Sequence, residues 1–251
     1  MLRSGERLRG IFNALPSPAI VEMCGYAGFD FVIIDNEHGS ANLETTENML
    51  RAARASGIVP VVRCLRHDIS RVLDMGASAV QIPMVSGAEE ARELVRQVRY
   101  PRDGRRGSAF SPRAAGYGAF PGAAHTQRSN AGVALIAMVE TPEGIDQAGD
   151  IAAVDGVDAV FVGPNDLSHA MGLSNDWKAP AVLAEIERAL RAVAGAGGCP
   201  GVLALTPEDE ERFGGWGARF FATVTSSVFT QALRQAASAD RQAGAGPPMN
   251  Y

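Results

Sequence analysis

Short apolar runs alternate with amphipathic stretches along most of the chain. The apolar runs do not alternate between apolar and polar residues, which is typical of strands buried on both faces. Eight such runs occur, at residues 10–14, 29–34, 59–62, 79–82, 134–139, 159–162, 201–205 and 220–224. Helical spacing lies between them, for example at residues 43–55, 88–98, 142–151, 181–193 and 207–213. Buried strands separated by helices predict a parallel sheet.

Eight strand-and-helix units in 251 residues favour one closed (β/α)8 barrel, a TIM barrel, over an open doubly wound sheet, which stays the alternative. Residues 1–242 are expected to form this domain, and residues 243–251, rich in glycine and proline, a flexible C-terminal tail. Residues 100–130 interrupt the pattern, because they are weakly periodic and rich in Gly, Arg and Ser. Such long insertions usually serve function or a subunit interface.

The composition is ordinary for a soluble globular protein, with 46% hydrophobic and 20% charged residues. The net charge of -5 argues against nucleic acid or an anionic membrane as a partner. No apolar run approaches the roughly 20 residues that cross a membrane, and the polar start does not resemble a signal peptide, so a cytoplasmic location is expected. Cys24, Cys64 and Cys199 show no paired spacing and are expected to be packing residues in a reducing compartment.

Polar side chains follow four of the predicted strands. In a (β/α)8 barrel the loops after the strands form the active site. His38 comes shortly after the second strand and Arg63 ends the third, while Glu140 follows the fifth and Asp166 the sixth. We therefore expect these four side chains to meet at one mouth of the barrel.

Glu140 and Asp166 follow consecutive strands, so their carboxylates are expected to lie close enough to repel each other. A divalent cation between them would remove this repulsion. Oxygen ligands suit a hard metal such as Mg²⁺ or Mn²⁺, with Co²⁺ as a further candidate and with waters or substrate completing the shell. The alternative is that each carboxylate only caps the helix that follows it.

Gly163, Pro164 and Asn165 stand at the predicted start of a helix, where backbone N–H groups bind anions. The carboxylate of a 2-oxo acid could lie there while a metal polarises its oxo group. Arg63 could then stabilise the enolate oxygen that develops. The alternative for Arg63 is a structural salt bridge.

His38 follows two carboxylates, Asp35 and Glu37, and is expected to act as general acid or base. Asp74 is the candidate that orients its imidazole. The alternative is that His38 is a half-buried loop residue and Asp74 a residue at a helix end. Surface or loop positions are expected for the other histidines, His67, His125 and His169.

Several other catalytic classes are excluded. The chain contains one lysine, Lys178, in a polar loop, so a strand lysine that could form an imine is missing and metal catalysis is the route left for aldol chemistry. No phosphate-binding loop and no Gly-x-Ser-x-Gly motif occurs, and the glycine-rich residues 195–198 precede a strand rather than follow one.

Several short fragments occur in an order and spacing that are specific when taken together. They are Gly28-Phe29-Asp30-Phe31, Ile34-Asp35 with Glu37-His38, Val61-Val62-Arg63, Asp74 with Gly76-Ala77, Ile82-Pro83-Met84-Val85, Arg99-Tyr100-Pro101 with Gly104 and Arg106-Gly107, Glu140-Thr141, and Phe161-Val162-Gly163-Pro164-Asn165-Asp166-Leu167-Ser168. From about residue 10 to residue 229 the chain resembles the class II pyruvate aldolases of the HpcH/HpaI family.

This resemblance implies a (β/α)8 barrel whose last helix swaps between subunits, and a hexamer made of three dimers. It implies metal ligation by Glu140 and Asp166. It also implies enolate stabilisation by Arg63 and proton transfer that involves His38 and Asp74.

The implied walls of the substrate pocket are Phe12 and Leu203. Residues 111–117, which include Arg113, are implied to lie near the site of a neighbouring subunit. The chain departs from some of these aldolases at Met138, where they carry a glutamine two residues before the metal-binding glutamate.

The leading hypothesis is a carbon–carbon lyase, an aldehyde-lyase that cleaves or forms a 4-hydroxy-2-oxo acid from pyruvate and an aldehyde through a metal-stabilised enolate. The alternative comes from a citrate-synthase-like branch linked to siderophore building, which condenses acetyl-CoA with oxaloacetate. Arg113 would then bind an extra carboxylate. A non-catalytic metal-binding barrel is disfavoured, because it would not need Arg63 and His38 beside Glu140 and Asp166.

Overall fold

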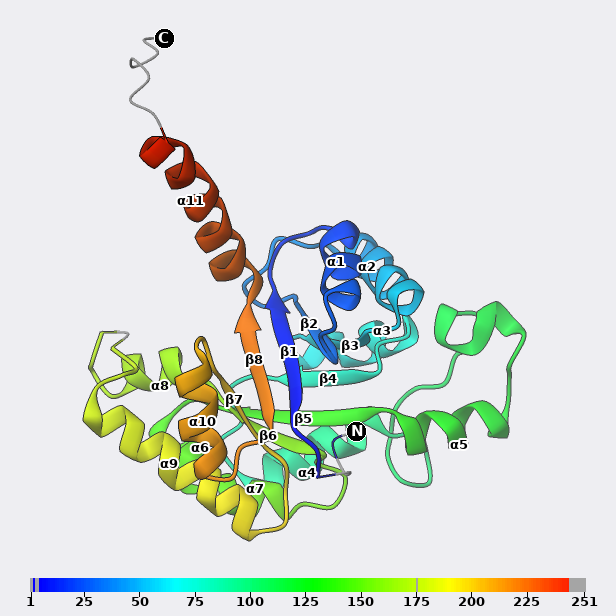
Figure 1. Ribbon diagram of the computed structural model, residues 1–251. Helices are drawn as coiled ribbons and strands as arrows, with labels where there is room; N and C mark the ends of the chain where they lie inside the picture. Colours follow the sequence, from blue (N-terminus) through cyan, green and yellow to red (C-terminus); the bar gives the residue numbers. More distant parts are fainter. Residues whose placement is uncertain (1, 3–4, 175, 244–251) are drawn as a thin grey trace.

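The strands pair in sequence order and close into a ring (Figure 1). The computed structural model describes residues 2, 5–174 and 176–243, and eight parallel strands lie within this part of the chain. They are β1 Leu8–Asn13, β2 Phe31–Asp35, β3 Val59–Arg63, β4 Ala79–Ile82, β5 Ala134–Val139, β6 Ala159–Val162, β7 Pro200–Leu203 and β8 Phe220–Val224. The (β/α)8 prediction is confirmed. The open sheet is wrong, because β8 pairs with β1 with Leu8 in register with Phe220.

Helices follow the strands and surround the ring (Figure 1). They are α1 Pro18–Tyr26, α2 Leu43–Ser56, α3 Ile69–Asp74, α4 Ala88–Val98, α5 Ala123–Gly132, α6 Pro142–Asp146, α7 Ala148–Ala152, α8 Pro164–Ala170, α9 Pro180–Gly195, α10 Pro207–Gly215 and α11 Thr225–Ala243, with short 3-10 segments η1 Arg66–Asp68 and η2 Arg113–Gly118. The predicted single helix over residues 142–151 is instead two helices, interrupted at Gln147.

The helices α6 and α10 begin with the same threonine cap. Thr141 after β5 and Thr206 after β7 take the N-cap position. Their hydroxyl oxygens accept the N–H groups of Gly144 and Asp209, each at 3.2 Å. A proline follows each threonine at the start of the helix, where its missing N–H costs no hydrogen bond. The first of these caps fixes the chain directly after Glu140.

The apolar core has two layers, one between strands and helices and one inside the ring. At the amino-terminal end of the strands, the rings of Phe31 and Phe220 stack with centroids 4.3 Å apart. Glycines make room for them, since a Cβ atom at Gly10 would lie 2.2 Å from the Phe31 ring and one at Gly201 would lie 2.7 Å from the Phe220 ring. The ring therefore has an aromatic floor. All three cysteines are free and buried, in agreement with the predicted packing role.

Residues 100–130 contain more regular structure than their sequence indicates. The segment η2 lies within this range, and most of α5 does too. His125 on α5 is buried, and its Nε2 atom lies 3.5 Å from the Tyr100 hydroxyl, so the expectation of a surface or loop position is wrong for this histidine. The helix was missed because its buried side is formed by His125 rather than by an apolar stripe. His67 and His169 are exposed, as predicted.

The last helix, α11, leads away from the barrel (Figure 1). Its contacts with β1 and β8 lie near its start, where the buried Thr225 hydroxyl donates to the Phe12 carbonyl oxygen at 2.9 Å. Val228 and Leu233 are exposed. The helix is described as far as Ala243, and residues 244–251 of the predicted tail lie outside the described residues. In the described part of the chain, no helix is long and apolar enough to cross a membrane.

Candidate active site

A cavity of about 160 Å³ opens at the carboxyl ends of the strands. Apolar and charged side chains line it together, namely Phe12, Ala14, Asp35, His38, Arg63, Met138, Phe161, Gly163, Pro164, Asn165, Asp166, Leu203 and Val224. Most of the residues that the sequence assigned to the site therefore meet here. Glu140 borders the same space, because a Cβ atom at Gly163 would lie 2.6 Å from the Glu140 Oε2 atom.

Arg63 ends β3 and is held by two carboxylates that follow or end β2. Its Nε and Nη2 atoms donate to Asp35 at 2.9 and 2.5 Å, and its Nη1 atom lies 3.3 Å from Glu37 Oε2. Burial alone would lower the pKa of Arg63, but the hydrogen bond and charge of Asp35 outweigh burial and raise it. The salt-bridge alternative for Arg63 is thus realised, yet the guanidinium still lines the cavity and lies 5.0 Å from the ring centre of Phe12.

Asp35 and Glu37 belong to the site, although the sequence analysis assigned them no role of their own. Asp35 Oδ1 accepts the backbone N–H groups of Glu37 and His38 at 3.1 and 3.2 Å, which folds the chain into a turn directly after β2. Burial acts to raise the pKa of Asp35, but Arg63 outweighs burial and holds this pKa below its ordinary value. The sequence did carry a signal, since a carboxylate that ends a buried apolar strand needs a cationic partner.

Glu140 follows β5 and is 3% exposed. Its Oε1 atom accepts the backbone N–H of Met84 at 2.8 Å, while its Oε2 atom has no hydrogen-bond partner among the described residues. Met84 reaches this place with a φ of +57°, a left-handed conformation that costs a non-glycine residue roughly 1–2 kcal/mol. The left-handed backbone at Met84 therefore holds Glu140 Oε1 in place. Because Gly163 has no side chain, the space beside Glu140 Oε2 is left open.

The pKa of Glu140 is raised to about 7, chiefly by burial and then by the charges of Asp166 and Glu37, against the Met84 N–H and Arg63. A cation beside Oε2 would favour the ionised form. Asp166 stands exposed in the first turn of α8 and adds carboxylate oxygens, so the pair fits a hard divalent cation that keeps waters. Within the described residues, no three His, Cys, Asp or Glu side chains are grouped to hold a metal. The remaining ligands would therefore be water or substrate.

Of three other residues that the sequence assigned to the site, His38 lines the cavity, whereas Asp74 and Arg113, both within the described residues, do not. The His38 side chain is 62% exposed and lines the cavity, with Nε2 at 3.9 Å from Glu37 Oε2. Asp74 ends α3 and accepts a hydrogen bond from Arg106 at 2.6 Å, and Arg113 donates to a backbone carbonyl at 2.7 Å. Neither Asp74 nor Arg113 is among the described residues that line this cavity. Their roles in the reaction stay predictions.

Gln81 on β4 is a polar residue beneath the cavity that the sequence analysis missed. It is fully buried and in register with Arg63. Its Nε2 atom lies 3.1 Å from Met138 Sδ, its Oε1 atom has no partner among the described residues, and Met138 Sδ lies 4.0 Å from Arg63 Nη1. The available signal was a lone amide in the apolar run of β4. The Gln81 amide on β4 therefore contacts Met138 on the neighbouring strand β5. Met138 stands at the position where some aldolases of the resembling family carry glutamine.

Replacing Gln81 with leucine is expected to leave the free energy of unfolding unchanged or to raise it by about 1 kcal/mol, because a buried acceptor without a partner is removed. The kcat is expected to fall on the order of tenfold, the effect of losing about 1.4 kcal/mol of positioning around Met138 and Arg63. Urea unfolding and steady-state kinetics measure the two effects, with Gln97→Leu on the surface helix α4 as control. A destabilised variant with normal kcat would make Gln81 a structural residue.

Two relatives that are similar over most of the chain are named aldolases. The family model described as HpcH/HpaI aldolase/citrate lyase matches residues 8–232. The hydroxypyruvate/pyruvate aldolase of Delftia acidovorans is 39% identical over 243 residues, which are 95% of this chain and 88% of that protein. The 5-keto-4-deoxy-D-glucarate aldolase of Enterobacter sp. is 36% identical over 232 residues, which are 91% of this chain and 90% of that protein.

Solved structures show the same fold. An HpcH/HpaI aldolase/citrate lyase family protein from Burkholderia cenocepacia has a TM-score of 0.91 at 34% identity, covering 96% of this chain and 97% of that one. Citrate synthase SbnG has a TM-score of 0.85 at 30% identity, covering 97% and 96%. The names of the relatives confirm the predicted enzyme class, a carbon–carbon lyase. By its motifs and by the match over residues 8–232, the chain belongs to the HpcH/HpaI aldolase/citrate lyase family.

Proposed function

We propose that this protein is a class II, divalent-metal-dependent aldolase that cleaves or forms a 4-hydroxy-2-oxo acid, with pyruvate and an aldehyde as the smaller compounds. One observation carries the proposal: the Glu140 oxygen without a partner among the described residues lies beside Gly163, at the border of the cavity that Asp166 and Arg63 line. The aldolase names of relatives at 39% and 36% identity support the same activity.

Glu140 and Asp166 are the proposed holders of the cation, which would be Mg²⁺ or Mn²⁺, with Co²⁺ as a further candidate. When bound, a cation of this kind polarises the 2-oxo group of the substrate. Arg63 supplies a fixed positive charge for the enolate oxygen, because Asp35 and Glu37 hold its guanidinium before substrate arrives. A donor fixed in advance acts on the charge that develops during the reaction.

The other cavity residues are proposed to position the substrate and to move a proton. Gly163 and the first residues of α8, Pro164 and Asn165, would hold the substrate carboxylate. The apolar side chains of Phe12 and Leu203 would exclude water. His38 would accept the proton of the 4-hydroxyl group as the C3–C4 bond breaks, and pyruvate forms when the enolate is protonated at C3. Its exposed imidazole can exchange that proton with water.

Self-association is proposed from α11. This helix leaves the barrel and exposes Val228 and Leu233, whereas most helical stability in proteins comes from tertiary packing. Exchange of α11 between subunits, as the sequence resemblance implies, would give it a packing partner, and a hexamer of three dimers is the proposed assembly. A cytoplasmic location without nucleic-acid or membrane partners belongs to the same proposal, in keeping with the net charge of -5.

A second candidate is the citrate-synthase-like condensation of acetyl-CoA with oxaloacetate. The observation that favours it is the likeness to citrate synthase SbnG, at 30% identity over 97% of this chain. The predicted grip of Arg113 on an extra carboxylate finds no support within one chain, because Arg113 is not among the described residues that line the mouth cavity. The aldolase relatives make the aldol reaction the first choice.

Deuterium exchange separates the two functions. With Mg²⁺ or Mn²⁺ in D₂O, the wild-type protein is expected to exchange the methyl protons of pyruvate, because an aldolase forms the pyruvate enolate without any aldehyde. Proton NMR follows the loss of the methyl signal, and Asp166→Ala with the same metal is the control. Release of free CoA from acetyl-CoA and oxaloacetate, with no exchange into pyruvate, would replace the aldolase by the second candidate.

A further inference from the structure

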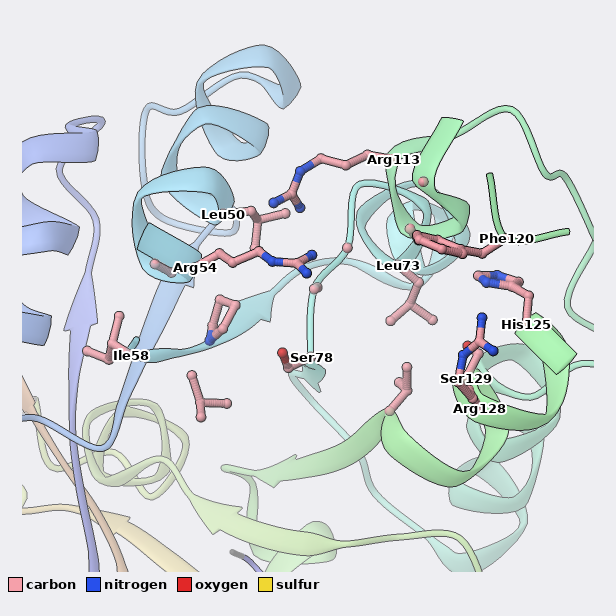
Figure 2. A pocket seen from close by; sticks show the side chains of 18 of the residues that line it. Leu50, Arg54, Ile58, Leu73, Ser78, Arg113, Phe120, His125, Arg128 and Ser129 are labelled. Carbon is pink, nitrogen blue, oxygen red and sulfur yellow. The ribbon is translucent and has the colours of Figure 1, made fainter. Parts of the chain in front are cut away.

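A second cavity, of about 570 Å³, lies away from the mouth (Figure 2). Val59, Ser78 and Val133 line it, which stand at or just before the starts of β3, β4 and β5. It is therefore at the opposite end of the strands from the candidate active site. The end of α2, the turn after α3, η2 and α5 form the rest of its wall.

The charged side chains that line this cavity have one sign. Arg54 from α2, Arg113 from η2 and Arg128 from α5 line it, together with the buried His125. No aspartate or glutamate occurs among the described residues of the wall. None of the three arginines forms an ion pair with a carboxylate in the described part of the chain, although Arg128 lies 6.0 Å from the ring centre of Phe120. Arginines without a carboxylate partner that share a cavity favour an anion between them.

Arg113 is fixed in this cavity before any ligand binds. Its Nη1 atom donates to the Met75 carbonyl oxygen at 2.7 Å and lies where a Cβ atom at Gly76 would be only 2.6 Å away. Gly76 also has a φ of +95°, so glycine serves both the turn and the guanidinium. Burial, followed by the charges of nearby Arg51 and Arg54, lowers the pKa of Arg113, against the opposing effects of Tyr117 and Glu47. The guanidinium is thus held close to other positive charges.

The positive groups stand on two sides of an apolar middle. Figure 2 shows Arg54 extending from α2 and Arg113 extending from η2 toward each other, and Arg128 and His125 on the right of the view. Burial and then the charges of Arg106 and Arg128, against that of Asp74, lower the pKa of His125. Apolar side chains and small hydroxyls complete the wall, among them Leu50, Ile58, Leu73, Phe120, Ser78 and Ser129.

We propose that this cavity binds a small molecule with two anionic oxygen groups, such as a dicarboxylate or a carboxylic acid that also carries a phosphate group. Arg54 and Arg113 would hold one anionic group, and Arg128 with His125 the other, while the apolar wall contacts the carbon chain between them. Arginine suits this task because its planar fork donates two parallel hydrogen bonds to a carboxylate or phosphate. Within one chain this cavity lies at the other end of the barrel from the candidate active site, and Arg113 is the one charged residue of its wall that the resemblance also places near the site of a neighbouring subunit.

Isothermal titration calorimetry at constant ionic strength tests the site, with succinate and inorganic phosphate as probes and acetate as the monoanion. Wild-type protein is expected to bind succinate or phosphate more tightly than acetate. Arg54→Gln and Arg128→Gln are each expected to weaken this binding at least about tenfold, the effect of losing one charge-assisted contact of about 1.5 kcal/mol. The matched control is Arg191→Gln on α9, where the arginine is exposed and paired with Glu187.

Three results would overturn the proposal. Equal binding by the wild type and both cavity variants would mean an adventitious ion only. Binding that requires added Mg²⁺, disappears in Asp166→Asn and persists in the cavity variants would place the anion at the mouth of the barrel. A changed molar mass in light scattering for Arg54→Gln or Arg128→Gln, without a change in anion affinity, would mean that these arginines meet carboxylates of a second copy of the chain.

Discussion

Turnover of a 4-hydroxy-2-oxo acid is expected to fall to background when divalent metal is removed, and to return when Mg²⁺ or Mn²⁺ is added. The loss should reach at least about 1000-fold, because a bound cation supplies several kcal/mol of charge stabilisation and each 1.4 kcal/mol is a factor of ten. Arg63 cannot substitute for the cation, since its Nε and Nη2 atoms are engaged by Asp35. Chelator titration with parallel measurement of protein-bound metal checks this result.

Variants of the two carboxylates test the same site without reference to activity. Glu140→Gln and Asp166→Asn are expected to weaken Mn²⁺ binding, followed by electron paramagnetic resonance, while circular dichroism stays that of the wild type. The fold should persist because residues at the carboxyl end of barrel strands serve chemistry more than stability. Glu143→Gln on α6, next to the same loop, is the control. Full turnover at a metal content near zero, or wild-type Mn²⁺ affinity in both variants, would contradict the metal assignment.

Arg63→Lys is expected to lower kcat on the order of 100- to 1000-fold, nearly as much as Arg63→Ala. Lysine keeps the charge but loses the planar fork that meets Asp35 and the enolate oxygen together. The loss should appear in kcat more than in KM, because the enolate charge is absent from the bound ketone. Steady-state kinetics measure the split between the two constants.

Stability has to be measured beside activity for these variants. Arg63→Ala leaves the carboxylate of Asp35 buried without its cation, which typically costs about 3–5 kcal/mol, whereas Arg63→Lys retains a positive charge. A low kcat in a stably folded Arg63→Lys protein therefore reports on the reaction. Arg66→Lys in the exposed turn η1 should behave as wild type. Normal pyruvate proton exchange in Arg63→Ala would remove Arg63 from the mechanism.

The barrel could be predicted because parallel strands buried on both faces appear in the sequence as plain apolar runs. The ends of elements were harder to predict wherever tertiary contacts decide them. β2 continues to Asp35 because Arg63 neutralises that carboxylate, and β3 likewise continues to Arg63. The helix α5 has no apolar stripe, and its one buried side chain, His125, packs against Tyr100 far back in the chain. Local periodicity contains none of this information.

The candidate site was predicted as far as strand ends determine it. Arg63, His38 and Asp166 line one cavity, and Glu140 borders it, as their positions after the strands indicated. The N–H that Met84 gives to Glu140 could not be foreseen, because it depends on a left-handed residue in another loop. The contact between Gln81 and Met138 depends on the register of two neighbouring strands, which apolar runs do not specify.

The aromatic floor of the barrel bears on how such an enzyme can diversify. Phe31 and Phe220 stack there. Their rings leave no space for a side chain at Gly10 or Gly201, so substitutions of these two glycines overfill the core. The mouth, by contrast, is made of loops and of strained backbone at Met84. Because the packing that closes the ring lies at the far end, mutations around the mouth can accumulate while the barrel stays closed. Substitutions at the mouth can therefore change which substrate fits, while the glycine and phenylalanine floor keeps its packing.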